Sequence, residues 1–319
     1  MHTLIIRPGA IGDSLLTLAV IQKLRERDRQ PHVTLVGNAA VLPLAQAFGL
    51  AEAVDNYDSS RWSELFSNAG IKSMELRGLL GQMERAIGWL PDPDGVVKQN
   101  LLAAGIKTVM ISPGRPPEGK HHLHRAVYMA ETLGLPPIDI TAPFIPPRRI
   151  VPLNAGTRPE YGSAPIAVHP GSASANKCWP VSHFLSLIDR LCSQGQPVLL
   201  LAGPADHERL ATLLDALAPR YGNKMLHTLV DVPLLKVAQQ LLQCQCYIGN
   251  DSGITHLAAM LGVPTIAIFG PSDPGNWRPL GSTVKVVRPM SPHCIEQLTV
   301  DAVMKTLETF SLEERSMPI

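Results

Sequence analysis

The segment 249–256 reads Gly-Asn-Asp-Ser-Gly-Ile-Thr-His and combines two glycines with polar side chains of the kinds that bind anions. It lies between an apolar run at 246–248 and an apolar helical pattern that stops at Gly262, so it predicts a turn from a buried strand into a helix. The first N–H groups of a helix lack intrahelical partners and carry partial positive charge, so such a turn can hold a phosphate without a lysine. Taken alone, a capped core helix with a buried His256 is the better explanation.

Similar turns follow apolar runs elsewhere in the chain. In the second half they are 169–172 (His-Pro-Gly-Ser), 202–204 (Ala-Gly-Pro) and 269–274 (Phe-Gly-Pro-Ser-Asp-Pro). Any one of them is a common loop, but four turns at one edge of a parallel sheet predict a nucleotide diphosphate site. Near the start, 9–13 (Gly-Ala-Ile-Gly-Asp) predicts another such turn, with Asp13 at or beside a helix N-cap. Its glycine spacing is not that of the dinucleotide fingerprint.

The elements that must position these turns are clearest in the second half. Strand-like runs occupy 166–169, 198–201, 225–230, 246–248, 265–269 and 284–287, and helical patterns occupy 181–192, 207–218, 234–242 and 255–261. Their alternation predicts a doubly wound parallel sheet, whose ligands bind at the carboxyl ends of the strands. A last helix at about 300–310 is predicted to pack back on the N-terminal domain.

The first half predicts a similar α/β unit with one ambiguous region. Strands are expected at 4–6, 33–36, from 53, and at 108–111, with helices at 14–27, 39–48 and 125–133. Between 59 and 93 the pattern is weak, and we expect a strand at 71–76 and a helix at 79–87. Frequent prolines from 136 to 165 predict an interdomain linker, so the expected domains are 1–155 and 156–319.

Composition places the chain among ordinary globular proteins. Of its 319 residues, 45% are hydrophobic and 17% are charged, and the formal net charge is +1. The length allows two cores, and the near-neutral charge argues against nucleic-acid binding through a broad basic surface. The five cysteines are scattered and not spaced as zinc ligands, as expected of reduced thiols in the cytoplasm. The sequence contains no evident signal peptide and no apolar run of about 18 residues, which predicts a cytoplasmic protein, at most peripheral at a membrane.

In order and spacing, these motifs resemble the ADP-heptose heptosyltransferases of glycosyltransferase family 9. The residues that carry the resemblance are 169–172, 177–180 (Lys-Cys-Trp-Pro), 202–208, 249–256, 269–274 and, at the N-terminus, 9–13. The similarity covers essentially the whole chain, and it is weakest between 51 and 120. It implies a GT-B fold of two Rossmann-like domains facing a cleft, with the acceptor bound by 1–155 and the donor by 156–319. It also implies an inverting transferase without metal or other cofactor, an ADP-heptose donor, and a lipid-linked acceptor of lipopolysaccharide-core type at the cytoplasmic face of the inner membrane.

The resemblance assigns roles to individual residues. Asp13 is implied as the catalytic base, which takes the proton from the attacking acceptor hydroxyl. Lys177 is implied as the cation that meets the charge on the leaving diphosphate. Ser172 would bind phosphate, and Asp206 or Glu208 would hold the ribose hydroxyls, with Asp206 preferred. The remaining implied donor contacts are Asp251, Ser252, Gly253, Ile254 and His256.

Other readings stay open. The basic loop before the helix at 125–133 could meet a phosphorylated or carboxylated acceptor through Lys120, His121, His124 and Arg125, whereas its histidines are not expected to bind a metal. Trp179 and Trp277 could stack on a base or sugar, but core or loop-anchoring roles fit them equally well. Two rival functions also remain, a nucleotide-sugar epimerase and a non-catalytic nucleotide-sugar-binding protein, besides a transferase that uses another sugar or acceptor.

Overall fold

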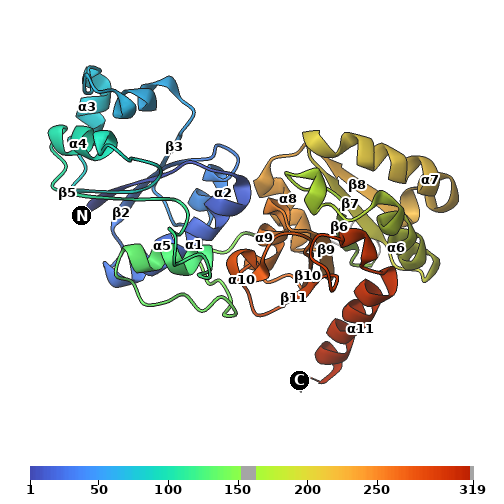
Figure 1. Ribbon diagram of the computed structural model, residues 1–319. Helices are drawn as coiled ribbons and strands as arrows, with labels where there is room; N and C mark the ends of the chain where they lie inside the picture. Colours follow the sequence, from blue (N-terminus) through green and yellow to red (C-terminus); the bar gives the residue numbers. More distant parts are fainter. Residues whose placement is uncertain (152–162, 317–319) are drawn as a thin grey trace. The chain divides into compact units, whose positions relative to one another are not determined.

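The chain folds into two compact units, shown in Figure 1. The computed structural model describes residues 1–151 and 163–316, and the side chains as far as residue 310. One unit comprises Met1–Asp139 with Ile145–Ile150, and the other comprises Ile140–Phe144 with Val151–Ile319. The expected boundary near residue 155 lies outside the described residues, and the assignment of donor and acceptor to the two units stays a prediction.

The first unit is a five-stranded parallel sheet in the order β3-β2-β1-β4-β5. Its strands are β1 (His2–Arg7), β2 (His32–Gly37), β3 (Ala53–Asn56), β4 (Arg85–Trp89) and β5 (Thr108–Ser112). Its helices are α1 (Ile11–Arg27), α2 (Leu42–Ala47), the 3₁₀ helix η1 (Ser60–Phe66), α3 (Met74–Leu80), α4 (Val96–Ala103) and α5 (Arg125–Thr132). In Figure 1, α1 and α5 cover one face of this sheet, while α3 and α4 lie on the other. Because side chains alternate along β1, Leu4 and Ile6 pack toward Leu76 and Leu101 on the second of these faces.

The ambiguous region from 59 to 93 was predicted wrongly. The segment expected to be a strand runs into helix α3, which starts after Ser73 because that side chain accepts a hydrogen bond from the Leu76 N–H at 3.2 Å. The segment expected to be a helix ends in strand β4, all of which is buried. Arg85 is the first residue of this strand, and its charge interrupts the apolar pattern that would predict a strand. It can be buried because its Nη2 atom pairs with Asp28 Oδ2 at 2.6 Å. Helix α4 was not predicted at all.

The second unit is a six-stranded parallel sheet in the order β11-β10-β9-β6-β7-β8. Its strands are β6 (Ile166–His169), β7 (Val198–Ala202), β8 (Leu226–Val230), β9 (Cys246–Asn250), β10 (Thr265–Ile268) and β11 (Val284–Val287). Its α-helices are α6 (Val181–Ser193), α7 (His207–Met225), α8 (Leu234–Leu241), α9 (Gly253–Met260), α10 (Pro274–Trp277) and α11 (Val300–Ser316), with 3₁₀ helices η2 (Ala175–Lys177), η3 (Pro204–Asp206) and η4 (Ile295–Gln297). The six strands and the doubly wound α/β fold confirm the sequence prediction.

Helices cover both faces of the second sheet. Helices α6, α7 and α11 pack on one face, where Phe184, Leu213 and Val303 join the strand residues in one core cluster. Helices α8 and α9 contact each other, and α9 packs on β9 and β10. The last helix, α11, thus packs on α6, β10 and β11 of its own unit, and its predicted return to the N-terminal domain stays a prediction. Among the described helices, none is both long and apolar enough to cross a membrane.

Candidate functional site

Each sheet has one topological switch point. In the second unit β6 lies between β7 and β9, and in the first unit β1 lies between β2 and β4. The loops that follow two such strands turn toward opposite faces of the sheet, which leaves a crevice at its carboxyl edge where ligands bind. Three of the five turns predicted to carry chemistry lie at these switch points, because they follow β6, β9 and β1. The other two, at 202–204 and 269–274, follow the neighbouring strands β7 and β10.

At the carboxyl edge of the second sheet, side chains from two separate turns meet. The Ser172 hydroxyl donates to the Asp251 carbonyl at 2.7 Å, and Lys177 Nζ lies 2.8 Å from Asp251 Oδ2. Asp251 is buried, whereas the Lys177 side chain keeps 33% of its surface exposed. An ammonium group has three donors, so a lysine held by one carboxylate can still bind an anion. Lys177 is therefore anchored to Asp251 at this edge of the sheet rather than a solvated loop lysine.

Helix α9 starts where the segment 249–256 was predicted to turn. Ser252 is its N-cap and accepts a hydrogen bond from the Thr255 N–H at 3.4 Å. Gly253 and Ile254 are the first two residues of the helix, and both are partly exposed. Their N–H groups belong to those that an α-helix cannot satisfy internally, so they suit a phosphate. His256 is only 2% exposed, which fits the core-histidine reading rather than a direct ligand contact.

Asp206 lies in a buried polar pair beneath this edge. Its Oδ2 atom is 3.1 Å from His169 Nε2 and accepts a hydrogen bond from the Gly203 N–H at 2.9 Å. Burial alone would raise the pKa of Asp206, but these two hydrogen bonds outweigh it and hold the pKa below its usual range. Asp206 is buried, whereas Glu208 is exposed in the first turn of α7, and which of the two holds the ribose hydroxyls stays a prediction.

His169 also reaches the cap of α9. Its Nδ1 atom lies 3.3 Å from Ser252 Oγ, so the turns after β6, β7 and β9 are joined through one imidazole ring. In the fourth turn, at 269–274, Asp273 is the N-cap of helix α10, and its side chain accepts a hydrogen bond from the Gly275 N–H at 2.9 Å. Trp179 is fully buried and donates to the Leu298 carbonyl at 2.9 Å, so it is a core residue.

In the first unit, Asp13 does not cap helix α1. The helix begins at Ile11 with Ala10 as its N-cap, which has no side-chain cap hydrogen bond, and Asp13 is the third residue of its first turn. Its carboxylate instead pairs with Arg7 at the end of β1, with Arg7 Nη2 2.8 Å from Asp13 Oδ1. The Asp13 side chain remains 23% exposed. The N-cap prediction is therefore wrong, but the carboxylate is accessible.

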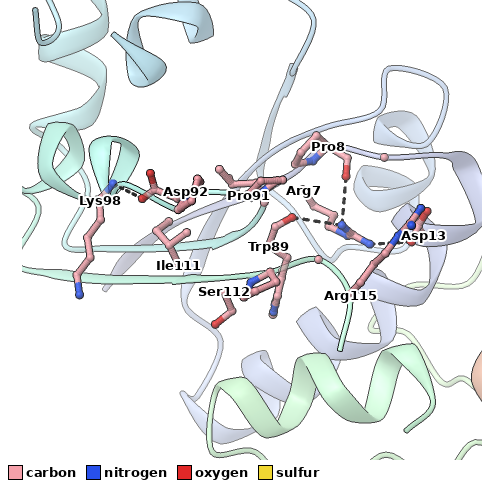
Figure 2. A pocket seen from close by; sticks show the side chains of 16 residues that line it. Arg7, Pro8, Asp13, Trp89, Pro91, Asp92, Lys98, Ile111, Ser112 and Arg115 are labelled. Atoms are coloured by element: carbon pink, nitrogen blue, oxygen red, sulfur yellow. Dashed lines mark hydrogen bonds and ion pairs between the residues drawn. The ribbon is translucent and has the colours of Figure 1, made fainter. Parts of the chain in front are cut away.

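Asp13 and Arg7 line a pocket of about 760 Å³ at the carboxyl edge of the first sheet (Figure 2). The pocket is built from the ends of β1, β4 and β5 and the loops that follow them, and the other lining residues are Pro8, Gly9, 89–93, Gly95, Lys98 and 111–115. Its walls combine apolar surface from Trp89 and Ile111 with the cations Lys98 and Arg115. Sequence reasoning missed these residues because it did not place β4, whose position next to β1 brings its loop to the same edge.

Cations outnumber carboxylates around this pocket, since Arg7, Lys98 and Arg115 line it together with Asp13 and Asp92. Burial lowers the pKa of Arg7, Arg115 lowers it further, and Asp13 raises it. Burial likewise lowers the pKa of Arg125, which Arg115 lowers further and Asp13 raises. Arginine still remains a cation at neutral pH, so these three guanidinium groups influence one another near the Asp13 carboxylate. Such an excess of positive charge suits a ligand with an anionic group.

The basic loop before α5 does not form one cluster. His124 is buried and is the N-cap of α5, where its Nδ1 accepts a hydrogen bond from the Ala126 N–H at 3.3 Å. Lys120 forms an ion pair with Glu131, and His121 is exposed. Of the four residues predicted to meet an acceptor, Arg125 interacts electrostatically with Asp13. Within residues 1–151 and 163–316, no group of three or more His, Cys, Asp or Glu side chains could hold a metal ion.

Comparisons with known proteins agree with this architecture. The sequence profile described as glycosyltransferase family 9 (heptosyltransferase) matches residues 114–306. The chain is 24% identical to lipopolysaccharide heptosyltransferase 1 of Escherichia coli O18:K1:H7 over 97% of each chain. It is 31% identical to lipopolysaccharide heptosyltransferase 2 of Salmonella typhimurium, but that match covers only 35% of this chain and 32% of the relative. The matched segment thus spans about a third of the length of that relative.

Solved structures share the fold. The structure of E. coli ADP-heptose LPS heptosyltransferase II has a TM-score of 0.78 at 20% identity and covers 99% of this chain and 100% of its own. E. coli heptosyltransferase WaaC with ADP has a TM-score of 0.69 at 20% identity and covers 97% of this chain and 99% of its own. At these identities the likeness is one of fold.

Proposed function

The chain belongs to glycosyltransferase family 9, and we propose that it transfers heptose from ADP-heptose to a lipopolysaccharide-core-type acceptor, with inversion and without a metal ion. The observation that carries this proposal is the convergence of Ser172, Lys177 and Asp251 at the switch point of the second sheet. A lysine anchored beside a helix N-terminus is a site for a diphosphate that needs no divalent cation.

We assign the second unit to the donor. Lys177 and the N–H groups of Gly253 and Ile254 would bind the diphosphate, with Ser252 beside them at the cap of α9. As the bond between the anomeric carbon and the phosphate oxygen breaks, negative charge grows on the diphosphate. A cation and helix N–H groups that are already in place stabilise that charge without reorganising. Glu208 would accept hydrogen bonds from the ribose hydroxyls.

We assign the first unit to the acceptor. Asp13 would take the proton from the acceptor hydroxyl while the hydroxyl oxygen attacks the anomeric carbon from the face opposite the diphosphate. The new C–O bond forms as the nucleoside diphosphate leaves, which inverts the anomeric configuration. Arg115 and Lys98, which line the pocket around Asp13, would bind an anionic group of the acceptor. A lipid-linked acceptor would place the protein in the cytoplasm, peripheral at the cytoplasmic face of the inner membrane.

Calorimetric titration with ADP, UDP and GDP, in the absence of divalent metal, tests the donor half. We expect ADP alone to bind, and Lys177→Ala to weaken it by about tenfold or more, the scale of one lost charge-assisted hydrogen bond. Lys224→Ala is the matched control, because Lys224 is exposed near the end of α7. Preferred binding of UDP or GDP would keep the fold assignment and overturn ADP-heptose as donor.

Turnover with ADP-heptose and a heptose-acceptor oligosaccharide tests the acceptor half. Asp13→Asn should preserve ADP affinity and abolish most transfer, because an amide cannot take the proton. Asp58→Asn, at an exposed position outside the pocket, should leave both unchanged. Transfer that survives Asp13→Asn at the wild-type rate would remove Asp13 from the mechanism, and tight ADP binding without any transfer would favour a non-catalytic binding protein.

A further inference from the structure

Arg7 occupies an unusual position for an arginine. It is the last residue of β1, the central strand of the first sheet, and only 6% of it is exposed. Its Nη1 donates to the Trp89 carbonyl at 3.2 Å and to the Pro8 carbonyl at 3.3 Å, while Nη2 reaches Asp13 Oδ1 at 2.8 Å. Figure 2 shows these contacts converging on one guanidinium group. Two of the three partners are backbone atoms, so the sheet itself fixes the orientation of the group.

The pocket wall leaves the guanidinium little freedom. A Cβ added at Gly114 would lie 2.5 Å from Arg7 Nη1 and 3.2 Å from the Trp89 carbonyl, so the loop after β5 closes directly over the group. The Arg7 Nε atom is buried and has no hydrogen-bond partner among the described residues. An arginine kept for stability alone would be expected to use its donors more fully, because an unsatisfied buried donor costs about 1–3 kcal/mol.

We propose that Arg7 is the positioning residue of the Asp13 base, holding Oδ1 so that Oδ2 alone is presented to the acceptor hydroxyl. This inference rests on the proposed function. Asp13 lies on the first turn of α1, and its side chain is 23% exposed, so without a partner its carboxylate could rotate about the side-chain bonds. Paired with a fixed guanidinium group, the same carboxylate presents one oxygen in one direction. Proton transfer needs that alignment at the moment of attack.

The chemistry of the step agrees with this arrangement. Oδ2 receives the hydroxyl proton as the acceptor oxygen bonds to the anomeric carbon and the diphosphate departs with the electrons of the broken C–O bond. Oδ1 already uses one lone pair on the contact from Arg7 at 2.8 Å, so Oδ2 keeps more of its acceptor capacity for the hydroxyl proton. Arg7 touches no substrate atom in this step, and it acts through Asp13.

Kinetics of Arg7→Ala and Arg7→Met, with ADP titration in parallel, test the proposal. We expect kcat to fall by about 10- to 100-fold, the scale of a misplaced catalytic group, while the ADP dissociation constant stays within about twofold. Guanidinium chloride at millimolar concentration should restore part of the kcat of Arg7→Ala, and methylammonium should restore less. Asp13→Asn should not respond to either ion. Unchanged kcat in both Arg7 variants, or a fall that guanidinium leaves untouched in the folded protein, would overturn the proposal.

A second variant keeps the test decisive if the Arg7 variants do not fold. Gly114→Ala pushes against Nη1 without removing the charge, so kcat should fall and the ADP dissociation constant should not change. Gly78→Ala is the matched control, because nothing lies within 4 Å of its added Cβ and Gly78 is exposed in α3. A kcat for Gly114→Ala equal to that of Gly78→Ala would contradict the proposal.

Failure of the proposed function is separable from failure of this inference. If the wild-type protein transfers no heptose, the proposed function falls, and the melting temperature of Arg7→Ala still reports on the pair. Guanidinium should then raise the melting temperature of Arg7→Ala and leave that of Arg7→Ala/Asp13→Asn unchanged. Equal responses of the two variants would show that Asp13 is not held by the guanidinium group.

Discussion

Gly171→Ala is expected to break the buried pair between His169 and Asp206. A Cβ at position 171 would lie 1.7 Å from Asp206 Oδ1, 2.3 Å from Cγ and 2.7 Å from Oδ2, distances at which no two such atoms coexist. Gly171 is buried in the turn that follows β6. The backbone of Asp206 is held in η3, because its N–H donates to the Gly203 carbonyl at 2.9 Å. The Asp206 side chain must therefore leave its site.

The cost follows from the contacts that the carboxylate loses. Asp206 Oδ2 accepts from the Gly203 N–H at 2.9 Å and contacts His169 Nε2 at 3.1 Å. Each hydrogen bond to a charged group contributes about 1.5–3 kcal/mol. We expect a loss of about 3 kcal/mol in the free energy of unfolding, at the lower end of the sum, because the displaced carboxylate can reach water.

A double-mutant cycle measured by urea unfolding checks the reasoning. Asp206→Ala removes the same contacts and should cost a similar amount, and Gly171→Ala added to Asp206→Ala should cost little more, because the clash has gone. Gly203→Ala is the control, since its Cβ would lie at an ordinary 3.6 Å from Asp206 Oδ2. Additive losses in the double variant, or a Gly171→Ala variant as stable as Gly203→Ala, would refute the argument.

Three further predictions concern stability and reactivity. Folding lowers the pKa of Asp206, so the stability that this carboxylate contributes is fully present above its unfolded pKa of about 3.9. That contribution is lost as the pH falls through the folded pKa. The difference in unfolding free energy between wild type and Asp206→Asn should therefore shrink below about pH 4. Gly78→Ala should raise the free energy of unfolding by about 0.5–1 kcal/mol, measured in urea, because alanine restricts the unfolded chain and meets no atom within 4 Å; a destabilised variant would contradict this. Burial raises the pKa of Cys192 to about 11 and that of Cys244 to about 12, so little of either thiol is ionised at about pH 8. Iodoacetamide at about pH 8 should therefore leave both thiols unmodified in the folded protein, as read by mass spectrometry of its peptides. Rapid labelling of the buried Cys192 or of the half-buried Cys244 would contradict the raised pKa values.

Much of the second unit could be predicted from the sequence alone. Parallel strands covered on both faces consist of short apolar runs, as at Val198–Ala202, and the helices between them have their own period. The turn chemistry of Ser252 and the following helix is also local, because a serine caps the helix that begins at the next residue. Residues that act on their immediate neighbours in the chain can be recognised without knowing the fold.

The pairing of functional side chains was decided by tertiary structure. Asp13 looked like a cap by its place in the sequence, yet it pairs with Arg7 at the end of the preceding strand. The Trp89 carbonyl that helps hold Arg7 comes from the neighbouring strand β4, 82 residues further along the chain. Asp206 was given a role toward the ribose by the resemblance, and only the order of the strands shows that His169 lies beside it. Local propensity fixes which segments become strands and helices. The order of the strands then determines which loops meet at the carboxyl edge, and that order depends on contacts far apart in the sequence.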